Sequence, residues 1–138
     1  MIKQAMAVII AAATITSCNN DTTPAEEKDK RISLSSDTVN VVTMRDTMVI
    51  YESTCRGCAY EASTSFDIED TAGVVKLEKI VTTDNNPSDM AGGNVSKELV
   101  IVPVKTGGTT FKLYKSWKGG FSAEDSARAK TYTVEVTN

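Results

Sequence analysis

Histidine is missing from all 138 residues of this chain. Without an imidazole, Ser-His-Asp and Cys-His nucleophiles are excluded, as are the metal sites that depend on histidine. The 18 acidic residues are scattered through expected turns and strand faces, and no recognisable catalytic motif places two of them together. We therefore expect a protein that is not an enzyme and that holds no metal or other cofactor.

Clusters of basic residues are lacking too. The chain has 15 lysines and arginines against 18 acidic residues, a formal net charge of −3. Nucleic-acid binding normally leaves a basic patch in the sequence. Because none is present, we expect no nucleic-acid partner.

The first residues differ in composition from the rest. Ala5 to Ile15 is an apolar run broken only by Thr14 and preceded by Lys3. This is the length of a signal-peptide core and is too short to cross a bilayer. Ile15-Thr16-Ser17-Cys18 resembles a bacterial lipobox, which implies removal of residues 1–17, lipidation of Cys18 and anchoring at the bacterial cell envelope. The alternative is an ordinary signal peptide with Cys18 incidental.

Residues 18–31 are polar and charged, include Pro24, and contain no apolar side chain larger than alanine. Such a segment cannot bury enough surface to fold alone, so it is expected to be a flexible tether. Residues 32–138 are enough for one domain with a single core. We expect this domain to be a monomer whose contact with the membrane is the lipid anchor alone.

The folded part has the pattern of about seven short strands separated by turns, with no crossover helices. This pattern predicts an all-β, immunoglobulin-like antiparallel β-sandwich, with an up-and-down barrel as the alternative. The expected strands cover residues 38–43, 47–52, 59–68, 74–81, 97–105, 108–117 and 131–137.

Cys55 and Cys58 lie in one expected loop, separated by two residues. Half of a zinc site is one interpretation, but the chain has no second pair to complete it. A redox pair is another, although such motifs use a helix N-terminus and a strand is expected here. In an oxidising envelope we predict a structural disulfide that stiffens the loop, and thiol–disulfide exchange is kept as an alternative.

Two further loops stand out. Gly92 and Gly93 allow backbone conformations closed to other residues. The only tryptophan, Trp117, follows a strand in which Phe111 and Leu113 share one face. Trp117 is either an exposed anchor for a partner or a lid folded onto the core.

Together the three loops resemble those of the chagasin family of cysteine-peptidase inhibitors, which are immunoglobulin-like domains. The segment 54–60 keeps the glycine, the alanine and the following aromatic residue of the family's first loop. Ala91-Gly92-Gly93 is similar to the second loop, and Lys115-Ser116-Trp117 stands where the family has Arg-Pro-Trp. The family's Asn-Pro-Thr-Thr run and its Arg-Pro pair are lost here.

The resemblance implies a wedge of three loops that inserts into the cleft of a papain-like cysteine peptidase. Gly57 would pass close to the peptidase's cysteine, while the glycine pair and Trp117 would grip either side. The alternative is a lipid-anchored binding module for a glycan or another envelope protein. The expected contact residues are Thr54, Cys55, Arg56, Gly57, Cys58, Ala91, Gly92, Gly93, Lys115, Ser116 and Trp117.

Overall fold

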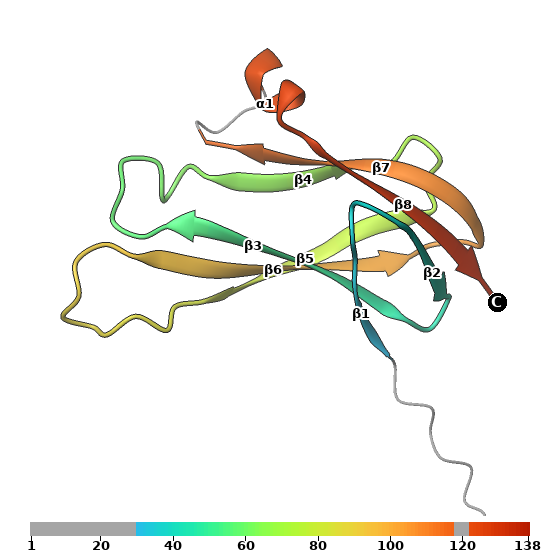
Figure 1. Ribbon diagram of the computed structural model, residues 1–138, viewed down its shortest axis with the longest axis horizontal. Helices are drawn as coiled ribbons and strands as arrows, with labels where there is room; N and C mark the ends of the chain where they lie inside the picture. Colours follow the sequence, from blue (N-terminus) through green and yellow to red (C-terminus); the bar gives the residue numbers. More distant parts are fainter. Residues whose placement is uncertain (1–29, 118–121) are drawn as a thin grey trace, which may run out of the picture.

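The computed structural model describes residues 30–117 and 122–138 as two stacked four-stranded sheets (Figure 1). One sheet has the order β1-β3-β6-β5 and the other β2-β8-β7-β4. This confirms the immunoglobulin-like sandwich over the barrel alternative. The elements are β1 (Arg31–Ser33), β2 (Val39–Thr43), β3 (Thr47–Cys55), β4 (Ser65–Glu69), β5 (Val75–Thr83), β6 (Asn94–Pro103), β7 (Gly107–Ser116), α1 (Ala123–Ala127) and β8 (Lys130–Thr137).

The predicted signal peptide, Cys18 and nearly all of the predicted tether lie outside the described residues. In the part of the chain that is described, no helix is long and apolar enough to cross a membrane.

The core lies between the two sheets because alternate residues of each central strand are apolar. Leu99 and Ile101 of β6 and Phe111 of β7 are almost completely buried. The rings of Phe111 and Tyr132 stack with their centroids 5.5 Å apart. The rest of the core cluster consists of Leu34, Val42, Met48, Ile50, Phe66, Val74, Val75, Leu113, Val134 and Val136.

One strand was not predicted from the sequence. β1 begins at Arg31, inside the segment expected to be a tether, and pairs in parallel with the start of β3. β2 likewise pairs in parallel with β8, so the chain changes sheets between these two short edge strands. Asn40 holds this crossing in place: its amide nitrogen donates to the carbonyls of Ser35, at 2.8 Å, and Thr133, at 2.9 Å.

Strand boundaries near the expected loops also differ from the prediction. β3 continues to Cys55 and β6 begins at Asn94, because these two residues are still paired in one ladder. β4 begins only at Ser65, since the preceding residues form turns in which the Thr64 amide donates to the Tyr60 carbonyl. The extended β3–β6 pair therefore leads directly into two of the candidate loops.

Asp70 holds the turn between β4 and β5. Its carboxylate accepts hydrogen bonds from the Thr109 hydroxyl, at 2.6 Å, and from the backbone amides of Ala72, Val74 and Val75. Partial burial alone would raise the pKa of Asp70, but these hydrogen bonds outweigh it and hold the pKa below its ordinary value. The turn is thus stabilised by the charged form of the side chain.

We expect Asp70→Asn to lower the free energy of unfolding by about 1 kcal/mol near neutral pH, a value reduced for partial exposure. Because the folded pKa is depressed, the wild-type advantage is present above the unfolded value of about 3.9 and is lost as the pH falls through the folded pKa. Urea unfolding of both proteins at pH 7 and pH 3 measures this difference. A gap of the same size at both values would contradict the assignment.

Candidate protein-binding loops

All three expected loops lie at one end of the sandwich, on the left of Figure 1. β3 ends at Cys55 opposite Asn94, where the second loop rejoins the sheet, and β7 ends at Ser116 opposite Ser65. Arg31 pairs with Thr47 at the start of β3, so the chain enters the sandwich at the other end.

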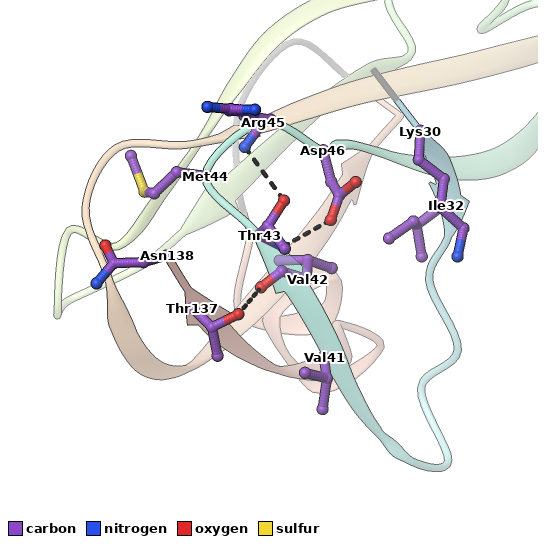
Figure 2. A pocket seen from close by; sticks show the side chains of 10 residues that line it. All are labelled: Lys30, Ile32, Val41, Val42, Thr43, Met44, Arg45, Asp46, Thr137 and Asn138. Atoms are coloured by element: carbon purple, nitrogen blue, oxygen red, sulfur yellow. Dashed lines mark hydrogen bonds between the residues drawn. The ribbon is translucent and has the colours of Figure 1, made fainter. Parts of the chain in front are cut away.

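The far end contains a cavity of about 1030 Å³, shown in Figure 2. It lies where the edge strands β1 and β2 leave the sandwich open, and is lined by residues that include Ile32, Val41 and Met44. The turn beside it is held by a 2.6 Å hydrogen bond from the Thr43 amide to the Asp46 carboxylate. None of the expected contact residues lines this cavity, so the loops remain the candidate site.

Arg56 joins the first loop to the second. Its backbone amide donates to the Gly93 carbonyl at 2.9 Å, and its guanidinium donates to the Met90 carbonyl at 2.6 Å. Its Nε also lies 2.8 Å from a carboxylate oxygen of Asp84. Hydrogen bonds from Asn86, together with the charge of Arg56, lower the pKa of Asp84 below its ordinary value. The Arg56 side chain, only 22% exposed, is thus a connector between loops.

The second loop depends on its glycines. Gly92 and Gly93 have φ angles of +81° and +98°, in the left-handed region that other residues rarely adopt. A Cβ on Gly93 would also stand 2.7 Å from the side-chain oxygen of Asn86, too close for any real contact. The Asn86 amide in turn donates to the Asn94 carbonyl at 2.7 Å. Conformation therefore requires glycine at both positions, and at Gly93 the Asn86 side chain would also have to move to admit a Cβ.

The third loop is tied to the first by two hydrogen bonds. The Lys115 ammonium donates to the Ser53 carbonyl at 2.7 Å and so bridges from β7 to β3 in the other sheet. The same ammonium lies 5.7 Å from the ring centroid of Trp117. The Ser63 hydroxyl, just before β4, donates to the Trp117 carbonyl at 2.5 Å. The three loops are therefore bonded to one another before any partner arrives.

Exposure separates the predicted contact residues into two groups. Trp117 is 45% exposed and lies outside the core cluster, so it is not a lid buried on the core, and its role as an anchor stays a prediction. Thr54 and Ser116 are buried, so their side chains support the loops from below. The remaining predicted residues lie at or near the surface of the loop end.

Two exposed residues were missed in the contact set predicted from the sequence. Tyr60 in the first loop is 41% exposed and Met90 in the second loop is 50% exposed. With Trp117, each loop then presents one large apolar side chain at this end of the molecule. Both residues could have been found from the sequence, because each is a large apolar residue within a segment that is otherwise rich in turn-forming residues.

Cys55 and Cys58 are free cysteines in this structure, with Cys55 exposed and Cys58 half-buried. A hydrogen bond with Cys58 is the main cause that raises the pKa of the Cys55 thiol above its ordinary value. The disulfide between the two cysteines stays a prediction. Among the described residues, no cluster of three or more metal-ligating side chains is present.

The molecule thus belongs to a definite structural class: an immunoglobulin-like β-sandwich that presents three interconnected loops at one end. A solved structure that aligns with this sandwich is the cysteine protease inhibitor EhICP2 from Entamoeba histolytica. It aligns with a TM-score of 0.54 and 22% sequence identity, over 80% of this chain and 98% of that one. Amebosin also aligns, with a TM-score of 0.48 and 12% identity, over 79% of this chain and 96% of its own.

No protein-family model and no curated protein sequence matches the chain. At 22% identity, the likeness to EhICP2 shows that the two chains share a fold. The chagasin-like fold implied by the loop motifs is therefore supported by structure.

Trp117 is the only tryptophan, so its fluorescence reports directly on the third loop. Lys115→Met removes the bond to Ser53 and the cation beside the indole ring. We expect quenching of Trp117 by acrylamide to increase by about twofold, because a loop released from such a charged hydrogen bond samples more open conformations.

The matched control is Lys112→Met, an exposed lysine on the same strand. It should leave the quenching unchanged. Equal quenching in the two variants would show that Lys115 does not position Trp117.

Proposed function

We propose that this chain is a protein inhibitor of papain-like cysteine peptidases, in which the three loops insert together into the active-site cleft. The observation that carries the proposal is the bonding between loops: Arg56 joins the first to the second, and the Ser63 hydroxyl, just before β4, joins the first to the third at the Trp117 carbonyl. Loops that are already ordered lose little conformational entropy on binding. The shared fold with a cysteine protease inhibitor supports this assignment.

In this proposal the chain supplies shape and apolar surface, and no catalytic group. Gly57 has a φ of +72° and no side chain, so its backbone can lie close to the reactive thiol of a peptidase. Trp117 is the largest of the exposed side chains in the three loops, and tryptophan is enriched among residues that dominate binding energy. Tyr60 and Met90 add apolar contacts from the other two loops.

We also propose that the mature chain is a monomer anchored through a lipid on Cys18 at the bacterial cell envelope. The point at which the chain enters the sandwich supports anchoring through the N-terminal segment, because Arg31 joins the sheet at the end opposite the loops. An anchored domain of this kind would present its loops away from the membrane.

A second candidate function, binding of a glycan or another envelope protein, uses the same loops. The exposed aromatic side chains of Tyr60 and Trp117 favour it, because aromatic rings with a polar handle serve many kinds of binding surface. Inhibition assays with papain distinguish the two functions.

Trp117→Ala should weaken inhibition of papain by about 2 kcal/mol or more, roughly thirtyfold, mainly through faster dissociation. The melting temperature should change little, because the side chain lies outside the core cluster. The inhibition constant and the thermal unfolding transition are measured on the same preparations.

Tyr51→Ala is the control, since Tyr51 is 62% exposed and belongs to β3, away from the loops. It should leave inhibition unchanged. A wild-type protein that inhibits no papain-like peptidase would refute the proposed function.

The proposed lipid anchor on Cys18 leads to a separate prediction about where the protein is found in the cell. Expressed as a precursor in a bacterium that lipidates such proteins, the wild type should fractionate with membranes and carry a lipid on Cys18. Cys18→Ser should appear in the soluble fraction or remain unprocessed, because it cannot accept the acyl chains that hold the protein at the bilayer. A wild-type mature protein without lipid would argue against the anchor.

A further inference from the structure

The first loop contains a pair of thiols on either side of the residue that connects it to the second loop. Cys55 is the last residue of β3 and pairs with Asn94, while Cys58 follows three residues later. Both thiols are free, and that of Cys55 lies 3.8 Å from the carbonyl oxygen of Arg56, the next residue. Arg56 and Gly57 are the only residues between them. Any bond between the two sulfur atoms would therefore enclose the loop connector.

We propose that Cys55 and Cys58 form a reversible dithiol–disulfide pair, and that closing the disulfide locks the connection that Arg56 makes between the first and second loops. The lock itself does not depend on the proposed function. Its consequence, redox control of binding at the loop end, does rest on it.

The chemistry requires an oxidant, and a low-molecular-weight disulfide is sufficient. One cysteine thiolate attacks a sulfur of that disulfide, forms a mixed disulfide and expels one small thiolate. The other cysteine then attacks the mixed disulfide, forms the Cys55–Cys58 bond and expels the second small thiolate. Two electrons pass to the small disulfide, and the two protons lost by the cysteines end on the released thiols. Excess small thiol reverses both steps.

Accessibility favours this exchange over a permanent disulfide. Cys55 is exposed, so a small disulfide or thiol can reach it directly, and Cys58, three residues further along the same loop, is the cysteine placed to resolve the mixed species. Exposed disulfides are in general the labile ones, whereas buried structural disulfides resist reduction. The pair thus has the accessibility of a switch.

Closing the ring restrains the residues that make the connection. In a disulfide the sulfur atoms stand about 2.05 Å apart, much closer than in a thiol hydrogen bond. To break the bond from its amide to the Gly93 carbonyl, Arg56 must rotate about backbone torsions that the ring limits. Gly57, at a φ of +72°, would gain the most conformational freedom when the loop opens, and the ring removes much of that gain. The ring therefore disfavours the open loop more than the bonded one.

The restraint extends across the second loop, because Arg56 is bonded to it at several points. Its guanidinium contacts the Met90 carbonyl and the Asp84 carboxylate, and its backbone amide donates to the Gly93 carbonyl. A first loop that stays in place keeps these contacts formed. We expect the disulfide form to bind a partner more tightly than the dithiol form, because its loops lose less conformational entropy on binding.

The test uses the full mature chain, equilibrated in buffers with graded ratios of reduced and oxidised glutathione. Alkylation followed by mass measurement gives the fraction of disulfide. Amide hydrogen exchange, followed by NMR, then compares Arg56 with Leu99, a core residue of β6, in the two redox forms. In the disulfide form the Arg56 amide should exchange at least about tenfold more slowly, while that of Leu99 stays the same.

The double variant Cys55→Ser/Cys58→Ser is the matched control and should show no dependence of Arg56 exchange on the glutathione ratio. A protein that remains a dithiol in the most oxidising buffer would overturn the proposal. So would a disulfide that forms without slowing exchange at Arg56.

A binding measurement separates this proposal from the proposed function. Calorimetry without reductant uses papain that has alanine in place of its catalytic cysteine, so that no reactive thiol interferes. Tighter binding by the disulfide form supports both proposals. A slowed Arg56 amide with no papain binding in either form supports the lock and overturns only the inhibitor function.

Discussion

The packing of two inner sheet faces is the constraint on which the rest of this molecule depends. Leu99 and Ile101 from one sheet and Phe111 and Val134 from the other fill the space between the layers. Burial of such side chains supplies most of the stabilisation in a domain of this size. Each strand must therefore keep its alternate residues apolar. The loops begin where that alternation stops.

The alternation stops at the loop end, where two lysines replace apolar residues on the inner face. Lys115 pairs with Phe66 and Lys130 pairs with Leu113, both of which are core residues. Both ammonium groups reach across to the other sheet. That of Lys115 donates to the Ser53 carbonyl, and that of Lys130 pairs with the Glu52 carboxylate. The hydrogen bond with Glu52 is the main cause that raises the pKa of Lys130. These contacts close the sandwich with polar groups directly beneath the three loops.

This polar closure explains how the three loops of a small β-domain are held in place. Loops on a sandwich are usually the most mobile part of the fold. Here the side chains of Arg56 and Lys115 act as cross-links. Each donates a hydrogen bond to a backbone carbonyl, and Arg56 also pairs with a carboxylate. A backbone carbonyl is present at every residue, so these hydrogen bonds do not depend on which side chain the partner residue carries. The exposed side chain of Trp117 is then presented by a framework that is ordered without a partner.

The sequence by itself determined the fold class, the absence of histidine chemistry and the identity of the three loops. Period-2 alternation, glycine pairs and a lone tryptophan are local signals, and strand and turn preferences can be read locally. Only the tertiary structure decided what the polar loop residues do. Arg56 and Lys115 were predicted as contacts for a partner, yet they bind Met90, Asp84 and Ser53 within the chain. Their partners lie up to 62 residues away, and such long-range pairings depend on sheet stacking that no local pattern encodes.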